Sequence, residues 1–189
     1  MLKKAIRGDY IQKRLSLTDE VWRENSIRIL NNFKLLRLPP VNYLLSYYPI
    51  VERKEFDISV CDEAVARKSP NVKIGWPRIE SDMETMEAYQ IQPDGLYAKN
   101  KFNILEPING EWIPPELIDL SFIPLVAFDK KGYRIGYGKG FYDRYLQRCR
   151  SSLMKIGFSF FEPVDSIKDI HEFDVPLSLC ITPSGIYEF

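Results

Sequence analysis

The sequence has few of the side chains that build metal centres and nucleophilic catalytic pairs. His171 is the only histidine in 189 residues, which excludes a histidine-rich metal site and a pair of catalytic histidines. The cysteines Cys61, Cys149 and Cys180 lie far apart and lack Cys-x-x-Cys spacing. Their wide separation argues against a zinc cluster or a disulfide framework. We therefore expect buried, reduced thiols without a nucleophilic role.

The sequence also lacks net charge and long apolar runs. Lysine and arginine together number 26, as do aspartate and glutamate, so no overall field recruits nucleic acid or an acidic membrane. No run approaches the ~20 apolar residues of a membrane span, and residues 1–9 carry no apolar signal core. We expect a cytoplasmic protein that binds neither nucleic acid nor membrane, and whose anion sites are local.

What the sequence does contain is enough apolar material for one core. With 45% hydrophobic residues, the chain predicts a single domain over residues 1–189. Segments with helical spacing alternate with short runs that are apolar throughout, which is typical of strands buried on both faces. The pattern predicts an α/β fold, namely a three-layer α/β/α arrangement around a mostly parallel central sheet.

The periodicity also predicts where the elements lie. We expect helices at 2–15, 19–36, 57–68 and 140–149. We expect strands at 41–48, at 71–76 before Pro77, and at 117–128, 155–161 and 177–182. Residues 80–115 lack clean periodicity and are interpreted as loop-rich, with a short strand suggested near 86–91.

The densest feature is a glycine cluster. Four of the ten glycines fall between Gly132 and Gly140, where an apolar strand leads into a helix. Glycine keeps side chains away from a ligand and supplies the positive φ angles of a nest of backbone amides. Arg134 and Lys139 add cations, and Asp143 could bind a metal that bridges phosphates. The stretch predicts an ATP-phosphate site.

Spacing alone leaves other interpretations open. The Gly-x-Gly-x-Gly alternation matches neither the P-loop nor the dinucleotide fingerprint, and a turn that packs a helix against a sheet explains it equally well. On the expected first helix, Lys3, Arg7 and Arg14 project within about 40° of one another. A solvated stripe is the commoner meaning of such a charged face.

Residues 124–129 (PLVAFD) and 132–144 (GYRIGYGKGFYDR) together resemble the signature block of the 5-formyltetrahydrofolate cyclo-ligases. Both ends of the chain support the resemblance: 3–7 and 14–16 resemble the family's basic N-terminal helix, and 171–176 (HEFDVP) with 181–182 its C-terminal block. The similarity covers essentially the whole chain. The segment 47–57 departs from the family spacing by being a residue or two longer.

The resemblance implies an ATP site and a metal site. The residues carried over for ATP are Lys3, Lys4, Arg7, Arg134, Gly136, Tyr137, Gly138, Lys139, Gly140, Phe141 and Tyr142. Within this set, Lys139 and Arg134 are the expected catalytic cations. Asp143 and Asp174 are the expected ligands of Mg²⁺, a hard cation that suits two carboxylates with phosphate oxygens. Asp143 could instead complement a helix N-terminus, and Asp174 could stabilise a turn.

For folate, the residues carried over are Tyr48, Glu55, Tyr137, Gly138, Lys139, Gly140 and Phe141. Glu55 could accept two hydrogen bonds from the amino-pyrimidine edge of a pterin, and Tyr48 offers an aromatic face. A surface glutamate within the charged run 52–55 is the alternative for Glu55. The large aromatics Trp76, Tyr89 and Trp112 are interpreted as core residues.

The reaction that the resemblance implies is 5-formyltetrahydrofolate plus ATP giving 5,10-methenyltetrahydrofolate, ADP and phosphate, through phosphorylation of the formyl oxygen. The expected cofactor is Mg²⁺, with ATP as co-substrate, and the expected partners are these small molecules, bound by a monomer. Two alternatives stay open, because fold alone does not determine chemistry. They are a non-catalytic nucleotide- or folate-binding module, and a sugar-phosphate or CoA-handling enzyme on a similar scaffold.

Overall fold

The computed structural model describes residues 1–91 and 95–189. Its helices are α1 (Lys3–Leu15), α2 (Asp19–Leu35), α3 (Ser59–Lys68) and α4 (Phe141–Leu146), with short 3-10 turns η1 (Val51–Arg53) and η2 (Pro115–Leu117). Its strands are β1 (Tyr43–Leu45), β2 (Lys73–Ile79), β3 (Met86–Gln90), β4 (Tyr97–Lys99), β5 (Leu105–Pro107), β6 (Glu111–Ile113), β7 (Leu120–Ile123), β8 (Ala127–Phe128), β9 (Arg134–Ile135), β10 (Met154–Phe158), β11 (Leu179–Thr182) and β12 (Gly185–Glu188).

Within these residues, one eight-stranded sheet has the order β12-β11-β10-β7-β1-β2-β3-β6. The strands from β11 to β2 pair in parallel, whereas β12 on one side and β3 and β6 on the other pair antiparallel. The predicted α/β fold with a mostly parallel central sheet is therefore confirmed. The antiparallel strands at both edges are an addition to the prediction.

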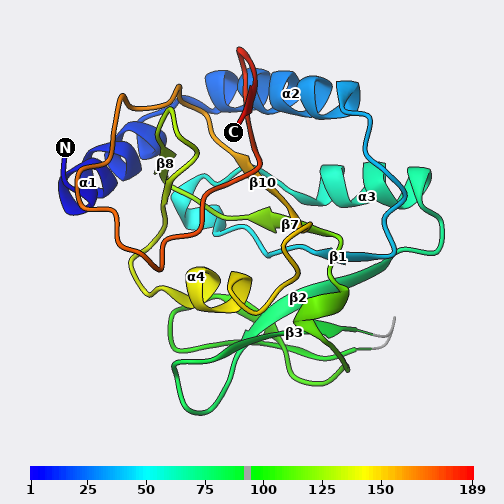
Figure 1. Ribbon diagram of the computed structural model, residues 1–189. Coiled ribbons are helices and arrows are strands. Elements are labelled where there is room, and N and C mark those ends of the chain that lie inside the picture. The colour runs from blue at the N-terminus through cyan, green and yellow to red at the C-terminus, as the bar shows by residue number, and fades with distance from the viewer. Residues whose placement is uncertain (92–94) are drawn as a thin grey trace.

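Alternate residues of the central strands pack into separate layers. Leu44 and Phe122 pack in a core cluster with α2 and α3, while their neighbours Leu45 and Ile123 pack in another cluster with α4. Figure 1 shows α2 and α3 on one side of the sheet and α4 on the other. A smaller cluster around Ile6 joins α1 to the β8–β9 hairpin. Because the central strands are covered on both faces, they read as continuous apolar runs.

The expected elements differ from the observed ones mainly at prolines. The strand expected to stop before Pro77 continues to Ile79, since β2 has parted from β1 after Gly75 and Pro77 pairs only with antiparallel β3. The strand expected over 117–128 is divided at Pro124, which has no amide to donate, and its second part forms the β8–β9 hairpin instead. The strand expected over 41–48 is shorter, and the helix expected to reach 149 ends at Leu146.

The three cysteines are free and at least partly buried, as the sequence predicts. Cys61 and Cys180 are buried and Cys149 is half-buried, all three are free thiols, and burial raises the pKa of each. A buried thiol with a raised pKa is a poor nucleophile. Among the described helices, none combines the length and the apolar character needed to cross a bilayer.

The aromatic cluster under α2 predicts a stability effect. Phe122 is fully buried, with ring centroids of Phe33 and Phe158 at 5.7 and 5.3 Å. Phe122→Ala is expected to lower the free energy of unfolding by about 3–5 kcal/mol, because it leaves a cavity that the sheet cannot close. Urea denaturation measures the change. The matched control is Phe173→Ala, whose ring is 62% exposed, and equal losses in the two variants would contradict this account of the core.

Candidate functional site

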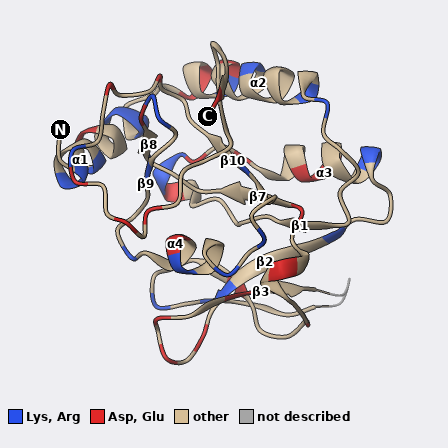
Figure 2. Ribbon diagram, viewed as in Figure 1, with Lys and Arg blue, Asp and Glu red and all other residues tan. Residues whose placement is uncertain are grey.

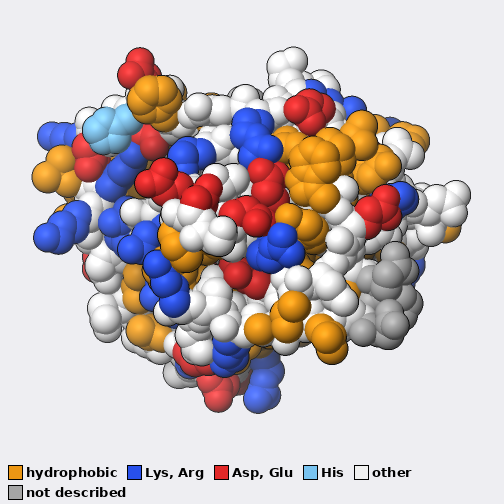
Figure 3. Space-filling view, turned by 90° about the horizontal axis from the view of Figure 1, so that it is seen from below, with side chains coloured by type: hydrophobic (Ala, Val, Ile, Leu, Met, Phe, Trp, Pro, Cys, Tyr) orange, Lys and Arg blue, Asp and Glu red, His pale blue; other side chains and the backbone are white. Residues whose placement is uncertain are grey.

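A cavity of about 460 Å³ opens between the glycine-rich loop and the antiparallel strands. Its walls come from α1, residues 47–55, β2, β3, the β4–β5 hairpin and residues 134–143. Basic and acidic side chains lie next to one another on the face of the molecule shown in Figure 3. A concave site with a few convergent charged groups is the usual form of a small-molecule site.

Three glycines of the 132–140 cluster have positive φ: Gly132 (φ 84°) in the β8–β9 turn, and two in the loop that leads into α4. Gly138 (φ 85°) and Gly140 (φ 71°) have left-handed backbone, and Gly140 immediately precedes α4. A Cβ on Gly138 would lie 3.2 Å from the guanidinium carbon of Arg7, whereas a Cβ on Gly136 would meet nothing within 4 Å. The predicted need for glycine is confirmed at Gly138 and Gly140. At Gly136 the backbone does not require it.

Helix α1 is fastened to this loop and to the C-terminal segment. The Arg7 Nε donates to the Gly136 carbonyl at 2.7 Å, and the Lys3 ammonium pairs with Asp174. Figure 2 shows the basic residues of α1 beside acidic residues of the C-terminal segment. The alternative of a solvated stripe is therefore wrong for Lys3 and Arg7, which both line the cavity. Lys4 is exposed and is not part of the cavity wall.

A buried ion pair joins the loop to the start of α4. The Arg134 guanidinium lies 3.0 Å from Asp143 Oδ1, and the Val175 amide donates to the same oxygen at 3.1 Å. The Arg134 guanidinium also donates to the Val175 carbonyl. Burial lowers the pKa of Arg134, although Asp143 opposes the shift. Arg134 is thus fixed by protein contacts on two sides, and Asp143 does more than complement a helix end.

Asp174 lies in the same corner of the cavity. Its Oδ2 accepts hydrogen bonds from the Lys3 ammonium and from the His171 amide, the latter at 2.7 Å. Burial alone would raise the pKa of Asp174, but Lys3 and the His171 amide outweigh it and hold the pKa below its usual range. Asp174 therefore stabilises a turn and also presents a charged carboxylate to the cavity.

The two carboxylates fit a metal that is bound partly by other ligands. Asp143 and Asp174 both line the cavity, and carboxylate oxygens are the ligands that Mg²⁺ prefers. In the described ranges 1–91 and 95–189, no group of three or more His, Cys, Asp or Glu could hold a metal. A Mg²⁺ here would have to complete its shell with phosphate oxygens or water, as Mg²⁺ commonly does.

Glu55 is buried rather than a surface residue, with 5% of its side chain exposed. Its Oε2 accepts from the Ile50 amide at 2.7 Å, and its Oε1 accepts from the Tyr137 hydroxyl. Burial raises the pKa of Glu55 above its usual value, although Arg14, Tyr137 and Ile50 oppose the shift. The surface alternative for Glu55 is thus wrong, and a buried acceptor lies at the cavity wall.

Tyr48 is the second expected folate residue, and it belongs to an aromatic group. Its ring stacks on Trp76 with centroids 5.8 Å apart and meets Tyr97 edge to face at 5.4 Å. Tyr48 lines the cavity, whereas Trp76 is not part of the cavity wall and packs against one face of the Tyr48 ring. Of the aromatics interpreted as core, Trp112 is 48% exposed, so that interpretation is wrong for it.

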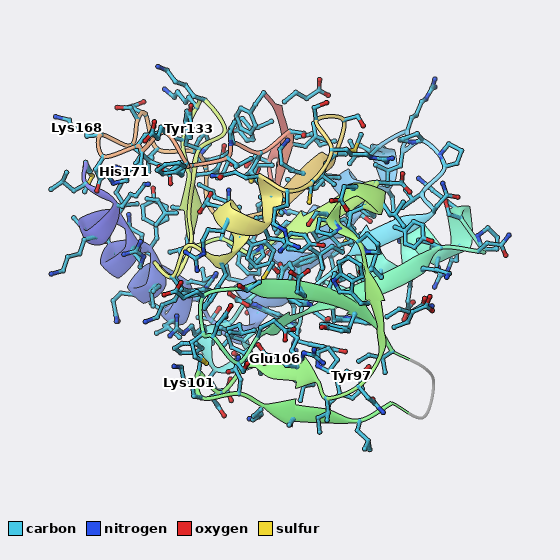
Figure 4. All side chains as sticks on the ribbon, turned by 60° about the horizontal axis from the view of Figure 1, so that its bottom comes forward. Tyr97, Lys101, Glu106, Tyr133, Lys168 and His171 are labelled. Atoms are coloured by element: carbon cyan, nitrogen blue, oxygen red, sulfur yellow. The ribbon has the colours of Figure 1, made fainter. Side chains whose placement is uncertain are left out.

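The β4–β5 hairpin contributes wall residues that the sequence did not indicate. Glu106 Oε1 accepts from the Ile79 amide at 3.0 Å and from the Asn100 side chain at 2.7 Å. Phe102 lies opposite the glycine-rich loop, with the Lys139 ammonium 5.2 Å from its ring centroid. Figure 4 shows the hairpin residues Tyr97, Lys101 and Glu106 far from Tyr133, Lys168 and His171. A signal existed in the asparagines, because the Asn100 side chain accepts from the amides of Phe102 and Ile104 and so forms a tight turn.

The model of the 5-formyltetrahydrofolate cyclo-ligase family matches residues 2–182. The chain belongs to this family. A 5-formyltetrahydrofolate cyclo-ligase of Mycoplasma pneumoniae is 29% identical over 185 residues, which cover 96% of this chain and 98% of the relative. One from Haemophilus influenzae is 43% identical over 89 residues, covering 45% of this chain and 47% of the relative.

Solved cyclo-ligase structures extend the similarity to the fold. The NMR structure of Aquifex aeolicus 5,10-methenyltetrahydrofolate synthetase superposes with a TM-score of 0.79 at 29% identity, covering 100% of this chain and 93% of that one. A 5,10-methenyltetrahydrofolate synthetase from Mycoplasma pneumoniae gives 0.75 at 27% identity, covering 97% and 99%. Both solved structures therefore match this protein over nearly its whole length.

The backbone of the glycine-rich loop predicts a contrast between two neighbouring glycines. Gly138→Ala is expected to lower the free energy of unfolding by about 1–2 kcal/mol, the cost of a left-handed alanine, and to displace Arg7 as well. The matched control is Gly136→Ala, which is expected to be neutral within about 0.5 kcal/mol because its Cβ meets open space. Thermal and denaturant unfolding measure both variants. The loop geometry is wrong if Gly136→Ala is the more harmful change.

Proposed function

We propose that this chain catalyses the ATP- and Mg²⁺-dependent cyclisation of 5-formyltetrahydrofolate to 5,10-methenyltetrahydrofolate, with release of ADP and phosphate. One observation carries the proposal. A single cavity has the glycine-rich loop, the α1 cations and two carboxylates in its wall together with the buried Glu55 and aromatic rings. The loop, the cations and the two carboxylates suit a polyphosphate with its metal, whereas Glu55 and the aromatic rings suit a pterin.

ATP phosphates are assigned to the part of the cavity between α1 and the loop. Lys3 and Arg7 line it, and Gly136 to Tyr142 supply its backbone. Because Gly138 and Gly140 carry no side chains, a phosphate can approach their amides closely. Lys4 is exposed and outside the cavity wall, so the α1 contribution to the ATP site rests on Lys3 and Arg7. Asp143 and Asp174 would hold Mg²⁺, which when bound neutralises and orients the phosphates.

Folate is assigned to the part of the cavity between Glu55 and the hairpin. Glu55 would accept hydrogen bonds from the amino-pyrimidine edge, and Tyr48 and Phe141 offer ring faces. Both oxygens of Glu55 already bind protein donors. A pterin that binds Glu55 must therefore share Oε1 with the Tyr137 hydroxyl or displace it.

The chemistry follows from the weak electrophilicity of a formyl amide. The formyl oxygen attacks the γ-phosphorus and the bond to ADP breaks, so the oxygen becomes part of a phosphate leaving group. Nitrogen 10 then attacks the formyl carbon and loses its proton, and the carbon–oxygen bond breaks to release phosphate. Phosphoryl transfer needs alignment and charge stabilisation more than a protein nucleophile. Lys139, Arg134, Lys3 and Arg7 are the cations available for this.

The direct test is to incubate the protein with 5-formyltetrahydrofolate, ATP and Mg²⁺ and to follow the near-ultraviolet absorbance of the methenyl product. Formation that requires all three additions supports the proposal. Binding of both substrates without product would instead indicate a non-catalytic module, and absence of binding would favour another substrate class. We also infer that the enzyme acts as a monomer, because residues of one chain line the cavity, and that it works in the cytoplasm.

The metal assignment predicts a shift in magnesium dependence. Asp143→Asn is expected to raise the Mg²⁺ concentration for half-maximal turnover by roughly ten- to a hundred-fold, because the metal loses one charged ligand. Asp143 also neutralises the buried Arg134, so unfolding midpoints must be measured with and without Mg²⁺ and ADP. Asp165→Asn, an exposed carboxylate paired with Lys130, is the control. An unchanged magnesium titration in Asp143→Asn would contradict the assignment of Asp143 as a metal ligand.

Lys139 has a separate expected effect on turnover. Its side chain is exposed at the cavity mouth between two glycines, where it can follow the γ-phosphate as charge moves. Lys139→Ala is expected to lower kcat by roughly ten- to a thousand-fold, the range for one preorganised electrostatic contact. The change in KM for ATP should be smaller. Lys131→Ala, an exposed lysine outside the cavity wall, is the control, and normal turnover in Lys139→Ala would reduce Lys139 to a solvated charge.

A further inference from the structure

Arg14 is a buried arginine to which the proposed reaction gives no role. Only 7% of its side chain is exposed, although it lies near the end of the amphipathic helix α1. Burying a guanidinium is costly unless charged or polar partners surround it. The identity of those partners therefore indicates what the residue does.

The partners of Arg14 all belong to the wall of the cavity or lie beside it. Its Nη2 donates to the Tyr137 hydroxyl at 2.7 Å and lies 3.7 Å from Glu55 Oε1, and its Nη1 donates to the Leu125 carbonyl at 3.2 Å. The Tyr137 hydroxyl in turn donates to Glu55 Oε1. Arg14, Tyr137 and Glu55 thus form one buried triad, named here the Arg14 triad, which joins three distant parts of the chain.

We propose that Arg14 is a positioning residue for the folate end of the cavity: it keeps Glu55 charged and orients the Tyr137 hydroxyl that lies against it. The inference rests on the proposed function, because it concerns how Glu55 is prepared for the pterin. A pterin donor that takes the place of Tyr137 at Oε1 still finds a carboxylate, since Arg14 remains to balance its charge. Arg14 itself need not touch the substrate.

Arg14 lies outside the cavity wall and differs in position from Lys3 and Arg7, the α1 cations that line it. It follows Arg7 by two helical turns, which is about 10 Å along the helix axis. Arg7 contacts the glycine-rich loop through the Gly136 carbonyl, while Arg14 contacts the Glu55 side. One helix thereby supports both ends of the cavity. Replacing Arg7 and replacing Arg14 should affect different substrates.

The charges around Glu55 give the direction of a pH effect. Burial raises the pKa of Glu55, and Arg14 is the strongest opposing group, followed by Tyr137, the Ile50 amide and Arg53. The other titratable groups that face or flank it are Tyr47, Tyr142, Lys54, Asp57, and Asp19 and Arg23 of α2. Loss of Arg14 removes the strongest opposition, so Glu55 becomes protonated at a higher pH. In the pH profile of kcat/KM for folate, the acidic limb, where activity falls as Glu55 is protonated, should then move to higher pH.

The experiment uses the full chain and measures steady-state kinetics against pH. Arg14→Met is expected to raise KM for 5-formyltetrahydrofolate at least about tenfold at neutral pH, the cost of losing a charge-assisted partner. KM for ATP should change less than about threefold, and the acidic limb for folate should shift to higher pH. Arg14→Lys keeps the charge and should retain the wild-type limb. Arg7→Met should show the reverse selectivity, and Lys13→Met, an exposed neighbour paired with Asp9, should show no change.

A double variant keeps the proposal falsifiable if Arg14→Met unfolds. Removing Arg14 leaves the buried Glu55 charge unpaired, so Arg14→Met/Glu55→Gln should be more stable than Arg14→Met and no worse for folate than Glu55→Gln alone. Equal rises in both KM values, or an unmoved acidic limb in Arg14→Met, would overturn the proposal and leave Arg14 with a structural role. Wild-type protein that forms no methenyl product would instead contradict the proposed function itself.

Discussion

Burial of charge in the cavity wall is the constraint on which the rest of this site depends. Arg14, Glu55 and Arg134 are each less than 10% exposed, and a buried charge persists only where partners compensate it. The partners come from segments far apart in the sequence, so satisfying each charge fixes where those segments lie. The Arg134–Asp143 pair fixes the start of α4 against the C-terminal segment. The site's shape is thus largely a consequence of electrostatic pairing, with the sheet as its support.

Much of the scaffold was predictable because its signals are local. Helices α1, α2 and α3 begin and end within two residues of the expected positions, since their apolar spacing can be recognised in the sequence itself. The hairpin β4–β5 was not predictable from periodicity, because its three-residue strands are too short to show a period. The two prolines gave opposite errors: a strand predicted to end before Pro77 continues through it, and a strand predicted to continue through Pro124 is divided there. Whether proline ends a strand depends on which neighbour needs its amide, and that is a property of the sheet.

The candidate site was predictable in its residues but not in its pairings. The glycine cluster and Asp143 could be located from the sequence, and the structure brings them together in one cavity. Helical spacing placed Lys3, Arg7 and Arg14 on one face, yet it carries no information about what packs against that face. The buried state of Glu55 was equally hidden, because the charged run around it looks solvated. Tertiary contacts decide such cases, and they override local composition.

The connection between the two ends of the chain has a consequence for biosynthesis. Lys3 pairs with Asp174 across 171 positions, and Arg7 bonds Gly136 across 129. A ribosome releases the N-terminal helix first, and at about 5–20 residues per second α1 waits on the order of 10 to 30 seconds for these partners. During that interval Lys3, Arg7 and Ile6 lack the partners that they have in the folded protein. The nucleotide end of the cavity is therefore among the last parts of a nascent chain to mature, and truncated chains that stop before residue 174 cannot assemble it.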